Sequence, residues 1–324
     1  MAVNAVKEGL SDSQVEEIRT AVRSIMQAEG LSQADVARGA DIPYGTFTPW
    51  LSGKYAGDNA ALALRVQRWI GSREGERRVI NLALAEPDFV ETPTAVEILN
   101  LLQWAKSAPG ITLITVGSGM GKSACTRYFQ TQNPHAYRVV MRPSTSGIHS
   151  MMSEIAQTLG VTERNPAKLT RAIGDKLRRN GRHTLIMVDE AQNLSDAAVD
   201  ELRHYLDEYG CGIALLGNED VQTRWGRATP KEGYGQLHRR IGARLRRLRP
   251  LPEDIDTYLA GWGVTDREVI KLLRVIGRKP GALGQIRETL LMANILAAGN
   301  GRSITGADIT AAWANRGGEH VEAL

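Results

Sequence analysis

The sequence predicts an α/β fold with a parallel sheet, and three apolar runs lead to this prediction. Residues Ile111–Val116 are apolar or β-branched, as in a strand buried on both faces. The runs Leu185–Val188 and Ile213–Leu216 are also apolar, and polar residues follow each of them. Helical patterns separate the runs, which indicates βα units. Ligands bind at the carboxyl ends of the strands in such sheets, so we expect the functional site there.

The bulk properties are those of a water-soluble protein with two or three domains. The chain has 324 residues, of which 42% are hydrophobic and 23% are charged. Its net charge of +4 permits an anionic partner without requiring one. Cys125 and Cys211 have no metal-binding spacing, which indicates a reducing compartment and no disulfide framework. Because no signal peptide or membrane-spanning run is apparent, we expect a cytoplasmic protein.

A glycine-rich turn follows the first strand. It reads Gly117, Ser118, Gly119, Met120 and Gly121, and then Lys122, Ser123 and Ala124 begin a helical pattern. Glycines let backbone N–H groups point at a phosphate, and the helix N-terminus adds positive potential. This layout predicts an ATP-binding loop in which Lys122 reaches the β- and γ-phosphates and Ser123 holds Mg²⁺. Val116 stands where the usual motif has its first glycine; the alternative is a chance glycine-rich turn.

Carboxylate and amide side chains follow the other two strands. Asp189 and Glu190 come after one of them, and Asn218 comes after the next. We expect Asp189 to act at the Mg²⁺ ion and Glu190 to orient and polarise the water that attacks the γ-phosphate. Asn218 is predicted to contact the γ-phosphate or that water; the alternative is an asparagine that only makes a turn.

A small helical bundle is predicted before this core. Four stretches have helical patterns: residues 12–28, 33–40, 44–52 and 58–70. The tight turn between the second and third stretches favours a helix-turn-helix, which would place Tyr44, Thr46 and Thr48 in the DNA major groove. Pro49 is unfavourable inside the second of these helices. The alternative is a bundle used for protein contacts or for packing alone.

We divide the chain into four parts. Residues 1–72 form the helix-turn-helix domain, 73–90 a linker, 91–251 the nucleotide-binding α/β core, and 252–324 a C-terminal helical domain. Six arginines lie between residues 237 and 251, where we expect a helix. One of them could reach the nucleotide of a neighbouring subunit, the group could bind nucleic acid phosphates, or it could be a solvated basic face.

Several segments together resemble the Mu B family of phage transposition proteins. They are LSGKYAGDN in the N-terminal part, FVETPT before the phosphate loop, GMGKS, LIMVDEAQNL, ALLGN and RRIGAR inside the core, and RKPGAL in the C-terminal helical domain. The resemblance covers nearly the whole chain. It implies an AAA+ core with a C-terminal helical lid, encoded by a phage or prophage and acting in a bacterial cell.

The resemblance also implies a function. Members of this family are AAA+ ATPases that form helical filaments on double-stranded DNA with little sequence preference. They select target DNA and deliver it to a DDE-type transposase of the Mu A kind, which stimulates their ATPase. Hydrolysis disassembles the filament and underlies target immunity. By motif, Asp189, Glu190 and Asn218 keep the roles given above, and Phe89, Val90 and Thr92 lie near the adenine. Arg240 is our first choice for an arginine acting in trans, with Arg239 and Arg244 next.

The chain departs from the family pattern in its C-terminal part. Gly284 stands where such ATPases often carry an arginine that senses ATP. Either this sensing is weaker here, or Arg287 has taken it over. For DNA contact from the core, we expect polar loops and helix starts that contain Thr145, Arg164, Lys168 and Arg171 to bind the DNA backbone.

Two other functions stay open. A helix-turn-helix transcriptional regulator with an ATP-sensing module would have a similar N-terminal domain. A helicase loader would have a similar core, but no helicase-contacting feature is apparent in the sequence.

Overall fold

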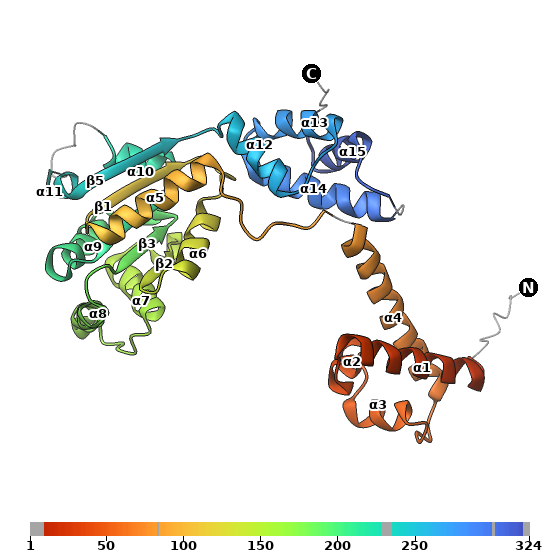
Figure 1. The fold of residues 1–324 in the computed structure, drawn as a ribbon. Coiled ribbons are helices and arrows are strands. Elements are labelled where there is room, and N and C mark those ends of the chain that lie inside the picture. The colour runs from red at the N-terminus through yellow and green to blue at the C-terminus, as the bar shows by residue number, and fades with distance from the viewer. Residues whose placement is uncertain (1–9, 83, 228–234, 300–301, 320–324) are drawn as a thin grey trace, which may run out of the picture. The chain divides into compact units, whose positions relative to one another are not determined.

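The computed structural model describes residues 10–82, 84–227, 235–299 and 302–319. Contacts between residues divide the chain into two compact units. The first comprises Met1–Ala83 with Ala298–Arg302, and the second comprises Leu84–Ala297 with Ser303–Leu324. The first unit is helical, and the second contains a sheet with helices around it and a further group of helices (Figure 1).

The N-terminal unit is built from α1 (Asp12–Glu29), α2 (Gln33–Gly39), α3 (Tyr44–Leu51) and α4 (Asn59–Leu82). Ser11 and Ser32 cap the first two helices, each in a reciprocal capping box. Phe47 and Trp50 of α3 are fully buried, together with Val22 of α1 and Val66 of α4. The short helices α2 and α3 follow each other as predicted. Helix α4 is longer than the predicted helix over 58–70 and continues to Leu82, through most of the expected linker.

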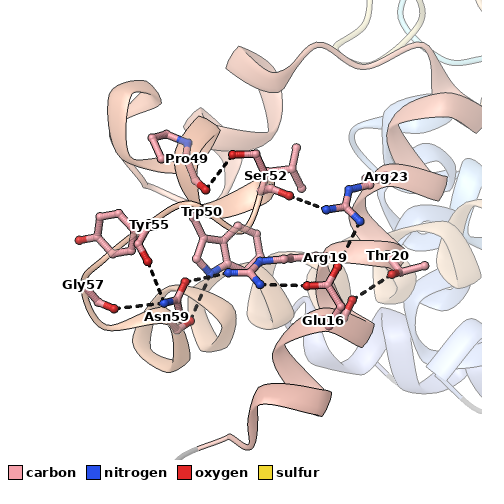
Figure 2. Close-up of polar contacts among 11 residues, drawn as sticks. Glu16, Arg19, Thr20, Arg23, Pro49, Trp50, Ser52, Tyr55, Gly57 and Asn59 are labelled. Atoms are coloured by element: carbon pink, nitrogen blue, oxygen red, sulfur yellow. Dashed lines mark hydrogen bonds and ion pairs between the residues drawn. The ribbon is translucent and has the colours of Figure 1, made fainter.

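A polar network joins α1 to the segment between α3 and α4, as Figure 2 shows. Arg19 is only 9% exposed and lies over the ring of Trp50, with its guanidinium carbon 5.3 Å from the ring centroid. It donates to Glu16 (2.9 Å) and to the side-chain oxygen of Asn59 (2.7 Å). The amide nitrogen of Asn59 donates to the carbonyl oxygens of Tyr55 and Gly57. The LSGKYAGDN segment is therefore held in place by Asn59 and Arg19.

The second unit contains a five-stranded sheet in which all paired strands are parallel. The spatial order is β2-β3-β4-β1-β5. The strands are β1 (Ile111–Val116), β2 (Ala136–Val140), β3 (Leu185–Asp189), β4 (Gly212–Gly217) and β5 (Ile241–Arg247). The central strands β1, β3 and β4 are buried at every position, which explains their continuous apolar sequences.

Helices cover both faces of this sheet. One face packs against α5 (Pro93–Ser107) and α6 (Lys122–Gln132). The other packs against α7 (Ile148–Leu159), α8 (Pro166–Asn180) and α9 (Asp196–Tyr209). Shorter elements complete the core: η1 (Pro143–Thr145), η2 (Ala191–Asn193), α10 (Glu219–Trp225) and α11 (Gly235–Arg240).

Four helices follow the sheet and have their own apolar core. They are α12 (Pro252–Gly261), α13 (Arg267–Gly277), α14 (Ala282–Gly299) and α15 (Gly306–Asn315). Leu273, Ile286, Leu290 and Ile309 are fully buried among them. Among the described residues, no helix has the length and apolar character needed to cross a membrane.

The prediction of a helix across the arginine-rich segment is wrong. Only its first residues belong to a helix, α11, and residues 241–247 form the edge strand β5. The apolar residues Ile241 and Leu245 are four apart, a spacing that places them on one face of a helix but also on one face of a strand. Backbone pairing with β1, from Ile111–Ile241 to Val116–Arg247, decides for the strand.

Candidate active site

The phosphate loop follows β1, and its geometry explains Val116. The Val116 side chain is fully buried in the core below α5 and α6, so this residue completes the strand. The turn itself contains Gly119 (φ 73°) and Gly121 (φ 83°), in the left-handed region that favours glycine. A Cβ atom at Gly117 would lie 2.4 Å from the carbonyl oxygen of Leu248. The loop therefore needs its three glycines but not a glycine at position 116.

Ser123 and Asp189 meet at the carboxyl ends of β1 and β3. The Ser123 hydroxyl donates to Oδ2 of Asp189 at 2.8 Å, and Arg138 of β2 donates to the same oxygen at 2.7 Å. The backbone N–H of Glu190 donates to Oδ1 at 3.1 Å. Asp189 is completely buried. The structure thus brings together the two residues expected at Mg²⁺ and adds an arginine that the sequence did not indicate.

Glu190 and Asn218 are joined through Gln192. Gln192 donates from Nε2 to Oε2 of Glu190 at 2.5 Å and accepts from the Asn218 backbone N–H at 3.3 Å. Glu190 has a left-handed backbone conformation with φ 57°, which directs the chain away from β3 at this residue. The Asn218 side-chain oxygen caps α10 by accepting from Asp220, so its amide NH₂ is the donor it can offer a ligand. Sequence reasoning missed Gln192, although it follows the Asp-Glu pair by two residues.

These residues line one cavity of about 620 Å³. That volume is in the usual range for a small-molecule site. It is lined by the whole phosphate loop with Lys122, by Glu190, Gln192 and Asn218, and by residues of the FVETPT segment, α12 and α14. The completely buried Asp189 forms the wall behind Ser123.

The three residues expected at the adenine, Phe89, Val90 and Thr92, all line this cavity. The Phe89 ring stacks on Tyr128, with centroids 4.1 Å apart and planes 10° apart. Phe89 and Val90 line the cavity together with Tyr258. Thr92 is 3% exposed, and its hydroxyl caps α5 by accepting from the Ala95 N–H. Thr92 therefore positions the start of α5, while Phe89 and Val90 supply apolar surface.

The C-terminal helices touch the phosphate loop directly. The Gly284 N–H donates to the carbonyl oxygen of Gly119 at 3.0 Å. A Cβ atom at Gly119 would lie 1.8 Å from the carbonyl oxygen of Gly281, and one at Gly284 would lie 3.3 Å from the Gly119 Cα. A side chain at Gly284 would therefore crowd the phosphate loop.

Arg287, one turn further along α14, also lines the cavity. It forms a two-pronged ion pair with Glu86, with Nε–Oε1 at 2.5 Å and Nη2–Oε2 at 3.0 Å. It also contacts Glu288. The hydrogen bond to Glu86 raises the pKa of Arg287 above its ordinary value. The arginine is thus at the cavity but is held by a carboxylate.

The candidates for an arginine acting in trans lie outside this cavity. Arg240, at the end of α11, forms an ion pair with Asp207 (2.6 Å), which raises the pKa of Arg240. Arg239 and Arg240 border a separate hollow with Trp104. Arg244 is exposed on β5. Arg240 precedes the amino end of β5, whereas the phosphate loop follows the carboxyl end of β1. Because the two strands pair in parallel, Arg240 and the loop lie at opposite ends of these strands.

The DNA-contact candidates differ in exposure. Arg164, Lys168 and Arg171 are exposed in the loop before α8 and in its first turns. Thr145 is only 6% exposed, and its hydroxyl accepts from the Arg142 N–H and donates to the Arg142 carbonyl. The expectation that Thr145 offers its hydroxyl to DNA is therefore wrong, because the hydroxyl closes its own turn.

The helix-turn-helix candidates are partly available. Tyr44 is 57% exposed at the start of α3. Thr46 and Thr48 are half-buried, and the Thr48 hydroxyl donates to Gln33 of α2 at 2.9 Å. Thr48 therefore links the two short helices, while Tyr44 projects from them.

The strand order β2-β3-β4-β1-β5, with a phosphate loop after β1 and carboxylates after β3, defines a P-loop protein of the AAA+ class. Residues 105–225 match the AAA domain family. Two solved structures share the fold, each with a TM-score of 0.52 and 16% identity. They are Cdc6p from Pyrobaculum aerophilum, covering 69% of this chain and 68% of that one, and the Aeropyrum pernix ORC1 protein in complex with DNA, covering 74% and 69%.

Residues 239–315 match the C-terminal family of the Mu B transposition protein. The ATP-dependent target DNA activator B of Escherichia phage Mu is 26% identical over 292 residues, which is 90% of this chain and 92% of that protein. The Mu-like prophage FluMu DNA transposition protein B of Haemophilus influenzae is 28% identical over 296 residues, 90% and 96% of the two chains. Over 90% of its length this chain is therefore similar to Mu B transposition proteins, and its C-terminal part matches the model of their C-terminal family.

Proposed function

We propose that this chain is an ATP-dependent target DNA activator of a Mu-like transposition system. In this function it binds ATP, binds double-stranded DNA with little sequence preference, presents that DNA to a DDE-type transposase and hydrolyses ATP. The observation that carries the proposal is the meeting of Lys122, the Ser123–Asp189 pair and Glu190 around one cavity. The similarity of the sequence also supports it, since 90% of this chain aligns with a protein named ATP-dependent target DNA activator B.

The residues around the cavity suit ATP and Mg²⁺. The glycine turn presents backbone N–H groups and the N-terminus of α6, which favour phosphate oxygens. The Lys122 ammonium adds a charge for the β- and γ-phosphates. A hydroxyl and a carboxylate are oxygen donors of the kind Mg²⁺ prefers, and Ser123 and Asp189 would hold it. Bound there, the metal would neutralise charge on the transferred phosphoryl group.

Glu190 is the residue we propose for the attacking water. A carboxylate accepts a proton and orients the water for attack. Gln192 holds this carboxylate and also touches the Asn218 backbone, so the three residues form one chain of hydrogen bonds across the ends of β3 and β4. The Asn218 amide NH₂ would donate to the γ-phosphate or the water. Through Gln192, a change at Asn218 can reach Glu190.

We further propose that hydrolysis needs a second subunit. Arg240 is held by Asp207 before the amino end of β5, away from the phosphate loop of its own chain, and it is our candidate for serving the loop of a neighbouring subunit. Assembly of this kind, repeated, gives a helical filament in which Arg164, Lys168 and Arg171 follow the DNA phosphates. Transposase-stimulated hydrolysis would then loosen the contact between subunits and release DNA, which is the basis of target immunity in this proposal.

Electron microscopy with ATP and random-sequence double-stranded DNA tests the function. Continuous filaments that require ATP are expected. Discrete binding to a single operator sequence would instead favour a helix-turn-helix regulator with an ATP-sensing module, for which the exposed Tyr44 at the start of α3 would be the reading residue.

The Glu190→Gln variant tests the hydrolysis step. Removing the carboxylate should lower the ATPase rate by roughly 10²-fold or more, while ATP and DNA binding persist. Filaments of this variant should therefore outlast those of the unmodified chain in a disassembly assay. Rapid disassembly of the variant would contradict the proposed role of hydrolysis.

A further inference from the structure

A positive charge, that of Arg138, lies beside Ser123 and Asp189, the two residues that we propose hold Mg²⁺. Arg138 lies on β2, on the face of the sheet that packs against α6. Its Nη2 donates to Oδ2 of Asp189 at 2.7 Å, the same oxygen that accepts from the Ser123 hydroxyl. The register of β2 and β3 pairs Val140 with Asp189 and Arg138 with Met187. Alternate residues of a strand share a face, so the side chains of Arg138 and Asp189 lie on the same face of the sheet.

This ion pair supplies the charge that a buried carboxylate needs. Asp189 is completely buried, and a buried carboxylate without a positive partner is strongly destabilising. Arg138 is the partner that the described residues provide. Its own Nε is buried without a hydrogen-bond partner in the described part of the chain, so Arg138 is itself incompletely satisfied. The hydrogen bonds around this pair therefore satisfy the Asp189 carboxylate more fully than the Arg138 guanidinium.

The position of Arg138 also disfavours the binding of a divalent cation at Asp189. A guanidinium hydrogen-bonded to Oδ2 neutralises part of the charge that would attract a divalent ion to the same carboxylate. It also occupies an acceptor direction on that oxygen, next to the one used by Ser123. A bare cation therefore gains little at this site. The triphosphate carries enough negative charge to outweigh one arginine.

We propose that Arg138 is a positioning residue that stands in for the metal's charge at Asp189 and makes divalent-cation binding depend on ATP. The inference rests on the proposed ATPase function, and it assigns Arg138 a regulatory role in that site. It follows that removing the charge of Arg138 should strengthen cation binding rather than weaken it.

The test compares Arg138→Met, which removes the charge, with Arg138→Lys, which keeps it. Arg142→Met is the matched control, because Arg142 lies just beyond β2 and pairs with Glu154 at 62% side-chain exposure. Binding of a fluorescent ATP analogue is measured against Mg²⁺ concentration. The Mg²⁺ concentration for half-maximal binding should fall about tenfold in Arg138→Met, as expected for loss of one nearby like charge. It should stay unchanged in the other two variants.

A second measurement uses no nucleotide. Mn²⁺ alone should raise the thermal unfolding midpoint of Arg138→Met more than that of the unmodified chain, because the site then lacks its own cation. If Arg138→Met does not fold, Arg138→Gln keeps a hydrogen-bond donor without the charge and serves in both measurements.

The outcomes separate the two proposals. An unchanged or higher Mg²⁺ requirement in the uncharged variant, or an equal Mn²⁺ response, would overturn the role of Arg138 and identify it as structural support only. Failure of the unmodified chain to bind the ATP analogue at any Mg²⁺ concentration would instead contradict the proposed function, and the Mn²⁺ measurement would still decide the role of Arg138.

Discussion

At the scale of single residues, the phosphate loop shows how close backbone contact limits side chains. Gly119 lies against Gly281, and its carbonyl oxygen accepts the Gly284 N–H. Any side chain at Gly119 would collide with the Gly281 carbonyl, which is 1.8 Å from the place a Cβ would occupy. Among the residues of the C-terminal helices that line the cavity, Arg287 is the one that carries a charge.

We predict that Arg287 takes part in nucleotide sensing. Arg287→Ala should lower the ATPase rate about tenfold or more, because a charge that stabilises the transferred phosphoryl group is removed. Glu86→Gln, which removes the carboxylate that holds Arg287, should keep or raise nucleotide affinity. The matched control is Arg274→Ala, since Arg274 of α13 forms a similar ion pair with Asp256 of α12. If Arg287→Ala kept the ATPase activity of the control, Arg287 would have no role in sensing the bound nucleotide.

The two cysteines are predicted to be unreactive in the folded protein. Burial raises the pKa of both the Cys125 and the Cys211 thiols to about 12. The thiolate is the reactive form, so at pH 8 only roughly one thiol in 10,000 is ionised, against about one in four for an ordinary cysteine. Alkylation should become measurable only as pH rises toward 12 or on unfolding. Fast labelling of the native protein at pH 8, at the rate seen in urea, would contradict this.

At the scale of elements, one asparagine organises the N-terminal bundle. Asn59 begins α4, accepts from Arg19 of α1, and holds the preceding loop through Tyr55 and Gly57 (Figure 2). The Trp50 indole N–H donates to the Asn59 carbonyl at 3.2 Å, so α3 is joined to the same residue. Three helices of the bundle therefore meet at this residue.

Asn59→Ala should destabilise the bundle by about 1–3 kcal/mol, because Arg19 and the loop carbonyls lose a buried partner. Hydrogen exchange of amides in α1 and α3 should accelerate, while exchange in the parallel sheet should not change. Lys54→Ala is the control, since Lys54 is exposed in the same loop. Uniform acceleration across the whole chain, or none in α1, would contradict the assignment.

The edge strand β5 shows where local patterns mislead. Its apolar residues repeat every four positions, and so the pattern fits a helix as well as a strand. The neighbouring strand β1 lies about 130 residues upstream, and only its backbone hydrogen bonds decide between the two. The strands β1, β3 and β4 were predictable because they are buried on both faces and are therefore apolar throughout.

At the scale of the whole molecule, the net positive charge is small, so contact with DNA depends on which surface carries the positively charged side chains. The net charge is +4. Arg164, Lys168 and Arg171 are exposed around the start of α8, and these three cations suit phosphate contacts without base reading.

Replacing Arg164 and Arg171 by alanine should weaken DNA binding, because fewer DNA phosphates are then neutralised by the protein. The slope of log affinity against log salt should fall by about one for each phosphate that is no longer neutralised. Arg178→Ala is the control on the same helix, since Arg178 pairs with Asp175 and lies over Tyr209. The measurement is a salt titration of DNA affinity with ATP present. A slope equal to that of the control would remove this segment from the DNA interface.

The sequence by itself determined the parts of the site that are contiguous in the chain. A strand that turns into glycines, lysine and serine, and a strand that ends in Asp-Glu, are local patterns whose geometry follows from backbone sterics and burial. Only the tertiary structure decided the contacts between segments. Arg138 reaches Asp189 across 51 residues, and Arg287 reaches Glu86 across 201. Strand order and helix packing set these distances, and no local pattern encodes them.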